Sequence, residues 1–385
     1  MRLQIAIVTL VVAAFVWPDR RARSDELAGL TRVFADSENN YVLTGAMEFT
    51  AKAERGYSLS TRALVDGISS ASTKVGADLD QAYVGGFSNR QRSRYKFSQP
   101  NWRRARYELS ASGGANFGEN ETGVGYIYSW ESIYESHTVY ARYLRHLAQR
   151  NASVSATWYH NFDSVLPDED EERADELGLP SRNDADGVSA AFQQALSRTT
   201  VVIVSASGRI ERGVLESPER DMRFDLADGI AAVGPERLPD ERTRAAGSVR
   251  LSQYLRPGSA VHGIYQYDLD EWGTRGHSVT GAWYVSPGQD VLLRLRVRYH
   301  TQSPSDYSTL SADIADDYYS GDPRLQGFSS WLAGARLAFG PSFAAPGRTV
   351  VSGGIDADLY YQTPRDGLEQ GYYAPIVGGN VLFQF

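Results

Sequence analysis

The sequence contains no cysteine, and only 22% of its 385 residues are charged. Without cysteine there is no disulfide framework, thiolate metal site, catalytic thiol or c-type haem attachment. The formal net charge of −8 is the wrong sign for a protein that binds the phosphates of nucleic acid, so no nucleic-acid partner is expected. EF-hand, H-E-x-x-H and Gly-rich phosphate-loop spacings are also absent, so the sequence predicts no cofactor and no metal site.

Beyond the first twenty residues, the chain also lacks any apolar run long enough for a membrane-spanning helix. The early run is residues 3–17 (LQIAIVTLVVAAFVW), which follows Arg2 and has the length and flanking charge of a secretory signal peptide. Small residues at Ala22 and Ser24 place the predicted cleavage after Ser24, so residues 1–24 are the expected signal peptide. The alternative is an uncleaved N-terminal anchor. With a signal peptide, the rest of the chain is built beyond the inner membrane.

The remainder alternates between apolar and polar residues with a period of two. In residues 290–300 (DVLLRLRVRYH), Leu293, Leu295, Val297 and Tyr299 fall on one face, and arginines and a histidine fall on the other. Residues 103–115, 121–132 and 348–362 show the same pattern. A wall between lipid and water requires this alternation in each strand, whereas a helix would scatter the arginines around its axis. The pattern predicts an all-β fold, although a soluble sandwich also alternates.

The spacing of these segments predicts a transmembrane antiparallel β-barrel of about sixteen strands over residues 41–385, with fourteen as the alternative. Residues 25–40 are expected to form a short periplasmic N-terminal segment. Short links then alternate with long polar ones at 163–185, 214–243 and 303–326, which places the long links on the outer side of the membrane. The long connection at 69–90 is periplasmic by this count. The expected strands are 41–54, 57–68, 91–98, 103–115, 121–132, 135–148, 151–162, 186–198, 199–213, 244–256, 259–271, 276–286, 289–302, 327–339, 348–362 and 374–385.

The last strand carries the most specific signal. Val381, Phe383 and the terminal Phe385 share one face of it. A final barrel strand that ends in an aromatic residue resembles the recognition signal of the bacterial outer-membrane assembly machinery. The sequence therefore predicts an integral protein of the bacterial outer membrane, with that machinery, membrane lipid and lipopolysaccharide as its partners.

Two further segments carry a family resemblance. Residues 64–73 (LVDGISSAST), residues 317–325 (DYYSGDPRL) and the overall layout resemble an uncharacterised family of bacterial outer-membrane proteins with a domain of unknown function. The resemblance implies a barrel and brings no catalytic residues with it. By analogy with other envelope systems, it also implies a periplasmic protein or lipoprotein as a further partner.

The inward phase of the strands collects more bases than acids. A wide barrel with such an interior favours anions, because rings of arginine or lysine lower the barrier for them. The alternative is a cross-strand salt-bridge network, such as Arg336 with Asp356 or Asp358, that only stiffens the wall. The expected selectivity residues are Arg62, Arg104, Arg106, Arg250, Arg294, Arg296, Arg298 and Arg336, and the acidic partners are Glu48, Asp66, Glu108, Asp356 and Asp358. Further inward positions are Lys52, Arg94, Lys96, Arg142 and Asp268.

Catalytic signals are weak. The six histidines include His160 near Asp163 and His300 near Ser303 and Asp306, but no G-x-S-x-G motif occurs. The carboxylates of the 163–185 and 303–326 loops, which include Asp306 and Asp322, are expected to be solvated. The sequence therefore predicts no enzyme and leaves two functions open. The first is a water-filled channel with a basic lumen for polar or anionic solutes. The second is a structural or docking barrel of a secretion, adhesion or electron-transfer assembly, whose lumen is plugged.

Overall fold

In the computed structural model, the chain forms β-strands, connecting loops and two short 3-10 turns, η2 (Ala148–Arg150) and η3 (Pro323–Leu325), within the part that the structure describes. No helix among those residues is long and apolar enough to cross a membrane. The predicted signal peptide lies outside the described residues. The structure describes residues 25–36, 40–53, 56–70, 102–166, 178, 180–217, 221–225, 231–309, 317–340, 350–364 and 372–385.

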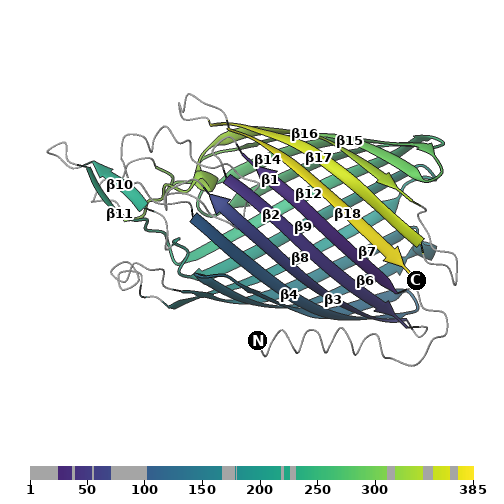
Figure 1. Cartoon of the computed structure of the whole chain (residues 1–385), viewed down its shortest axis with the longest axis horizontal. Coiled ribbons are helices and arrows are strands. Elements are labelled where there is room, and N and C mark those ends of the chain that lie inside the picture. The colour runs from purple at the N-terminus through teal and green to yellow at the C-terminus, as the bar shows by residue number, and fades with distance from the viewer. Residues whose placement is uncertain are drawn as a thin grey trace.

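Sixteen antiparallel strands form one closed barrel (Figure 1). Each strand of the barrel pairs with the next barrel strand along the chain, β9 pairing with β12. The ring closes where the first strand pairs with the last, from Glu26 opposite Gln384 to Phe34 opposite Ile376. The strands are β1 (Glu26–Ala35), β2 (Asn40–Lys52), β3 (Tyr57–Ser70), β4 (Trp102–Phe117), β5 (Asn120–Trp130), β6 (Tyr134–Leu147), β7 (Ala152–Val165), β8 (Ser181–Ala195), β9 (Thr200–Gly213), β12 (Glu241–Arg256), β13 (Ser259–Asp270), β14 (Arg275–Gly288), β15 (Val291–Gln302), β16 (Phe328–Phe339), β17 (Val350–Pro364) and β18 (Tyr372–Gln384).

The predicted fold class and the count of sixteen are confirmed, but the predicted set of strands is wrong at one place. Residues 25–40 are not a segment outside the barrel, because β1 lies within them and closes the ring. The predicted strand at 91–98 lies outside the described residues, and the ring closes without it because β3 pairs directly with β4. The inward predictions for Arg94 and Lys96 fall outside the described residues with it.

The two ends of the barrel differ. Short turns such as 257–258 and 289–290 join strands at one end, where Asp25 and Phe385 also pair through two backbone hydrogen bonds. The long links after β7, β9 and β15 all lie at the other end, which we call the loop end. The connection after β3 starts there too, because Ser70 pairs with Trp102 beside those loops. The prediction that the 69–90 connection lies at the same end as the short turns is therefore wrong. Because β1 is an additional strand at the start of the barrel, every link before β4 lies at the opposite end from the predicted one.

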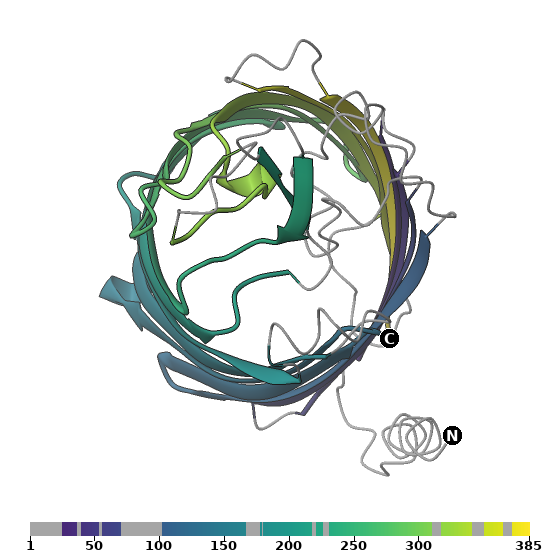
Figure 2. The ribbon, with the colours of Figure 1, turned by 90° about the vertical axis from the view of Figure 1, so that its left-hand side faces the viewer.

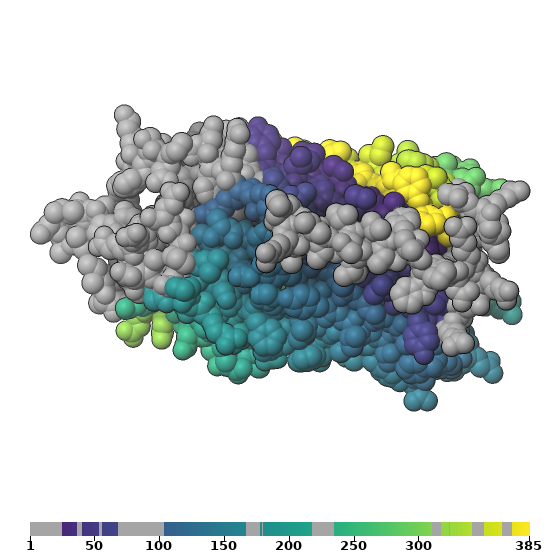
Figure 3. Space-filling view, turned by 60° about the horizontal axis from the view of Figure 1, so that its bottom comes forward, coloured from purple at the N-terminus to yellow at the C-terminus, as the bar shows by residue number. Residues whose placement is uncertain are grey.

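The outer face of the barrel is apolar. On β15, Leu295 and Val297 are 41% and 50% exposed and point outward, while the arginines between them point inward. Outward aromatic residues gather toward both ends of the strands. Tyr107, Trp130, Tyr299 and Trp331 lie toward the loop end, and Tyr57, Phe192, Trp283 and Phe339 lie toward the turn end. In a space-filling view from one side, the described strands form a continuous wall (Figure 3). An apolar band between two aromatic girdles is the outer surface of an outer-membrane β-barrel.

At the loop end, connecting segments lie over the opening of the ring, and the β10–β11 hairpin among them projects beyond the barrel (Figure 1). The end-on view shows the β10–β11 hairpin, η3 and their flanking loops inside the outline of the ring (Figure 2). The hairpin comprises β10 (Asp221–Asp225) and β11 (Ala231–Pro235) and belongs to the link between β9 and β12. We call the described parts of the links 214–240, 271–274 and 303–327 the cap.

Candidate functional site: the inner wall and the loop-end cavity

Strand register decides which charged side chains line the interior. Paired residues in a sheet share a face, so the face of each position can be followed around the ring from the exposed apolar residues. By this criterion all the predicted selectivity arginines, their acidic partners, and Lys52, Arg142 and Asp268 lie on the inner face. The register also places residues there that the sequence did not single out: Glu26, Arg32, Glu121, Asp163, Arg209, Glu211, Arg242, Arg244 and Asp270.

Several of the predicted bases are paired with predicted acids. Arg106 lies 3.3 Å from Asp66, and Arg62 lies 4.0 Å from Glu108. Arg336 lies 3.7 Å from Asp356 and also donates to Asn380 at 2.7 Å. The pairing of Arg336 with Asp356 is the one suggested by the sequence. Glu48 instead accepts a hydrogen bond from Ser60 at 3.0 Å. These contacts stiffen the wall and neutralise part of its positive charge.

The best-formed ion pair crosses an intervening strand. Arg296 on β15 donates from Nε and Nη2 to both carboxylate oxygens of Asp358 on β17, at 2.9 and 2.6 Å. Between them on β16 lies Gly334, which pairs with both residues in register. A Cβ atom at Gly334 would lie 1.7 Å from Asp358 Oδ1, so only glycine leaves space for this bidentate contact.

Four inner arginines differ from those described above. Among the described residues, no carboxylate lies within 4.0 Å of Arg142, Arg250, Arg294 or Arg298. Arg250 donates to His262 Nδ1 at 2.9 Å and to Ser252 at 3.2 Å, and Arg298 donates to Ser278 at 3.0 Å. Arg294 stands directly opposite Arg336 on the neighbouring strand. Three of the four lie on β12 and β15, and Arg142 lies on β6.

A small core of its own holds the cap together. Leu238, Trp272 and Leu325 are buried against one another, one from each contributing link. Ser320, which is fully buried, donates a hydrogen bond to Glu236 Oε2 at 2.5 Å, and the backbones of Arg237 and Tyr319 pair through two hydrogen bonds. The side-chain amide of Gln302, at the end of β15, donates to the carbonyls of Arg324 and Gln326. The cap is therefore fixed to the barrel wall.

A buried carboxylate of the cap corrects one expectation. Asp322 is only 4% exposed and binds the Arg324 guanidinium through both oxygens, so it is not a solvated loop acid as predicted. Trp272 is 3% exposed and stacks under the Arg242 guanidinium at 4.3 Å. Burial raises the pKa of Glu216, and the nearby Glu236 carboxylate adds to the effect against the opposing hydrogen bond from the Leu238 amide. The acidic run at 168–176 lies outside the described residues.

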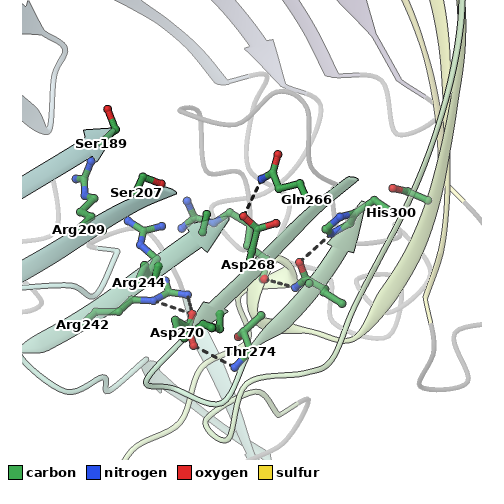
Figure 4. A pocket seen from close by; sticks show the side chains of 18 of the residues that line it. Ser189, Ser207, Arg209, Arg242, Arg244, Gln266, Asp268, Asp270, Thr274 and His300 are labelled. Atoms are coloured by element: carbon green, nitrogen blue, oxygen red, sulfur yellow. Dashed lines mark hydrogen bonds and ion pairs between the residues drawn. The ribbon is translucent and has the colours of Figure 1, made fainter. Parts of the chain in front are cut away.

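Beneath the cap, the inner wall encloses a cavity of about 620 Å³. Side chains from β9, β12, β13 and β15 point toward this space (Figure 4). Arg209 and Arg244 both contact Glu211, and Arg242 pairs with Asp270, which also accepts a hydrogen bond from the Thr274 amide. The lining includes Tyr159, Arg209, Arg242, Arg244, Gln266, Asp268, Arg298, His300, Gln302, Phe328 and Tyr360.

The histidine groupings seen in the sequence do not persist in the fold. His160 points outward, where its Nδ1 lies 2.8 Å from Asp186, whereas Asp163 is on the inner face with Tyr134 and Ser136. His300 contacts Ser278 at 2.8 Å instead of Ser303. No group of three or more candidate metal ligands occurs among the described residues.

The carboxyl-terminal residues lie where the sequence places them relative to lipid. Val381, Phe383 and Phe385 are 40%, 39% and 42% exposed, and the first two pair outward with β17 and β1. Their role as an assembly signal stays a prediction.

Comparison with known proteins identifies a family without a known function. Residues 187–377 match a family described as "Protein of unknown function (DUF3570)". The predicted resemblance is confirmed. The matched segment contains the motif at 317–325 but not the one at 64–73. No curated protein matches the sequence.

Solved structures with a similar architecture include a bacterial polysaccharide outer membrane secretin, with a TM-score of 0.49 and 8% identity over 95% of this chain and 99% of that chain. CdiB from Acinetobacter baumannii has a TM-score of 0.48 and 9% identity over 94% of this chain and 60% of that one. The siderophore receptor PirA from Pseudomonas aeruginosa has a TM-score of 0.39 and 11% identity over 94% and 63%. The barrel assignment rests on the strand pairing itself.

Proposed function

We propose that the protein is a channel of the bacterial outer membrane whose inner wall favours anionic and polar solutes. The observation that carries the proposal is the group of inner arginines without a carboxylate partner among the described residues, namely Arg142, Arg250, Arg294 and Arg298. A fixed positive charge inside a low-dielectric wall raises the local concentration of anions and lowers their barrier to passage.

The outer surface supports a place in the membrane. The apolar band with aromatic girdles suits the lipid interior and its two interfaces, and lipopolysaccharide would surround the loop end. Short turns at one end and long loops at the other are typical of the periplasmic and external sides. In this orientation the cap and the cavity face the outside of the cell, and the end of the ring-closing seam where Asp25 pairs with Phe385 faces the periplasm.

The cap narrows the external opening and so restricts which solutes reach the arginines. Because it is fixed to the wall by Gln302 and by its own core, we propose that it acts as a constant filter at the entrance. Solutes that carry negative charge and many hydrogen-bonding groups are expected to pass in preference to apolar ones.

The docking alternative is less well supported. A long connection at 69–90 on the periplasmic side would offer a surface for a periplasmic partner, but the strand ends that flank this connection pair at the loop end. A periplasmic or lipoprotein partner remains a proposal that co-purification from native membranes would test. The assembly machinery, reading Val381, Phe383 and Phe385, remains a proposed partner in the same way.

Reconstitution in a planar lipid bilayer under a potassium chloride gradient tests the channel. We expect steps of conductance and a reversal potential displaced toward chloride. The double variant Arg294→Gln/Arg298→Gln should reduce the preference for chloride by about twofold or more, because the two unpaired charges are removed. Arg212→Gln is the matched control, since Arg212 points outward and pairs with Glu241 at 3.1 Å. An absence of conductance over repeated insertions, or a preference for potassium, would exclude the proposal.

A further inference from the structure

The cavity beneath the cap has the size and lining of a ligand site. Its volume of about 620 Å³ lies within the range of about 300–1,000 Å³ that small-molecule sites occupy. We propose that it binds an acidic saccharide, meaning a sugar or short oligosaccharide that carries carboxylate groups. The inference deepens the proposed function, because it names the solute class for which the channel would be selective.

One side of the cavity has more positive charge than its own acids neutralise. Arg209 and Arg244 stand directly opposite each other on β9 and β12 and share the single carboxylate of Glu211, with Arg209 at 2.8 Å. Like charges on directly paired residues destabilise a sheet, and the single carboxylate of Glu211 balances only one of the two, so an anionic ligand beside them would be stabilised. Within the described structure, the buried Nε of Arg209 has no hydrogen-bond partner.

Arg298 adds a second unneutralised charge to the same space. It lines the cavity from β15, donates to Ser278 and has no carboxylate within 4.0 Å among the described residues. Guanidinium groups bind carboxylates through paired hydrogen bonds in a fixed plane. The ligand is therefore expected to present at least one carboxylate to these arginines.

The wall between β12 and β15 offers an acceptor, which argues against a simple inorganic anion. Asp268 on β13 accepts a hydrogen bond from Gln266 at 2.7 Å and forms no ion pair among the described residues. A free carboxylate repels a second anion but accepts hydrogen bonds from hydroxyl groups. A ligand that suits both the arginines and Asp268 carries hydroxyls as well as a carboxylate, as an acidic sugar does.

The remaining lining fits the rest of such a ligand. Gln302 and His300 add polar groups beside Asp268, and Tyr159, Phe328 and Tyr360 supply aromatic rings. The carbon-bound hydrogens of a pyranose ring pack on aromatic surfaces, while its hydroxyls hydrogen-bond to amide, imidazole and carboxylate groups. A purely apolar ligand would leave these polar groups without partners.

Titration calorimetry of the full-length protein in detergent, with digalacturonate as the probe, tests the site. Maltose serves as the neutral probe and acetate as the anion without a sugar. We expect digalacturonate to bind and the other two to bind about tenfold or more weakly. Arg244→Gln and Arg298→Gln should each weaken digalacturonate binding by about tenfold, since each removes a charge-assisted hydrogen bond to the ligand. Arg244→Gln leaves Glu211 paired with Arg209, so the wall should still form.

The matched control is Arg212→Gln, on the same strand as Arg209 but on the outer face, and its affinity should equal that of the wild type. Equal binding of maltose would overturn the anionic part of the inference, and equal binding of acetate would overturn the saccharide part. Absence of digalacturonate binding in a protein that conducts chloride would overturn the site and leave the channel intact. Binding of digalacturonate without conductance would support the site and overturn the channel.

Discussion

Two arcs of the same barrel wall are alike outside and different inside. The inner faces of β12 to β17, which we call the arginine arc, carry guanidinium groups and carboxylates such as Arg296 and Asp358. The inner faces of β5 to β8, which we call the tyrosine arc, carry fewer charged groups, among them Arg142 and Asp163, and more glycine, hydroxyl groups and tyrosines. The outward residues of both arcs are apolar. Lipid therefore dictates only one face of each strand, and the interior is left to vary with function.

The tyrosine arc shows how aromatic rings pack against the inner wall. A Cβ atom at Gly125 would lie 2.3 Å from Tyr140 Cζ, and one at Gly187 would lie 2.1 Å from Tyr159 Cζ. Each ring thus lies flat over the glycine opposite it on the neighbouring strand. In the arginine arc, Gly334 has the corresponding role for an ion pair instead of a ring. The same device, a glycine beneath a long side chain, supports both arcs.

The largest effect is expected from breaking the ion pair of the arginine arc. Arg296→Leu leaves the carboxylate of Asp358, whose side chain is 4% exposed, without its bidentate partner. The free energy of unfolding should fall by about 3 kcal/mol, because an unpaired buried charge is costly. Urea unfolding in lipid vesicles measures it. The double variant Arg296→Leu/Asp358→Leu should recover most of the loss, and failure to recover it would mean that the pair is not the cause.

A smaller loss is expected from overfilling the tyrosine arc. Gly125→Val should lower the free energy of unfolding by about 1–3 kcal/mol, since the new side chain collides with the Tyr140 ring. Adding Tyr140→Ala should restore part of it. Gly113→Val is the control, because a Cβ atom there meets nothing within 4 Å. Equal losses from both valine variants would show that the ring does not occupy the space over Gly125.

The smallest effect concerns the cap, which rests on the arginine arc. The raised pKa of Glu216 means that the folded cap holds this proton more tightly than the unfolded chain does. The cap should therefore become more stable as the pH falls through the folded-state pKa of Glu216, and should lose that stability as the pH rises through it. Hydrogen exchange of the Leu238 amide, corrected for its intrinsic rate, should show greater protection at the lower pH. In Glu216→Gln this pH dependence should be absent.

Much of the barrel could be predicted from period-two alternation, because lipid and water impose it on each strand separately. The exception is β1. Its inward face carries Leu30 and Phe34, and Phe34 packs on Tyr360, Tyr372 and Ile376 inside the barrel. With apolar residues on both faces, the strand shows no clear phase. The prediction omitted β1 and counted a strand at 91–98 instead, so the total of sixteen was still correct. The omission of β1 also placed the 69–90 connection at the wrong end of the barrel.

The phases of the inner charges could also be predicted, but their partners could not. Alternation gives the face of Arg296, whereas its contact with Asp358 depends on the register of three strands and on Gly334 between them. Arg209 was missed because residues 201–204 (VVIV) are apolar on both faces and define no phase. The cavity beneath the cap depends on contacts between links far apart in the sequence, such as Ser320 with Glu236, which no local pattern reveals.

The seam between β1 and β18 constrains how the barrel can form. These two strands are the most distant in the sequence, yet their pairing is what removes the last open edges of the sheet. An unpaired edge in hydrocarbon leaves a row of amides and carbonyls without hydrogen bonds, at a cost of several kcal/mol for each group. A half-built sheet is therefore unstable in lipid, and entry into the bilayer has to be coupled to joining the first strand to the last. Folding of this chain should accordingly be slow and all-or-none, with the joining of its two ends as the committed step.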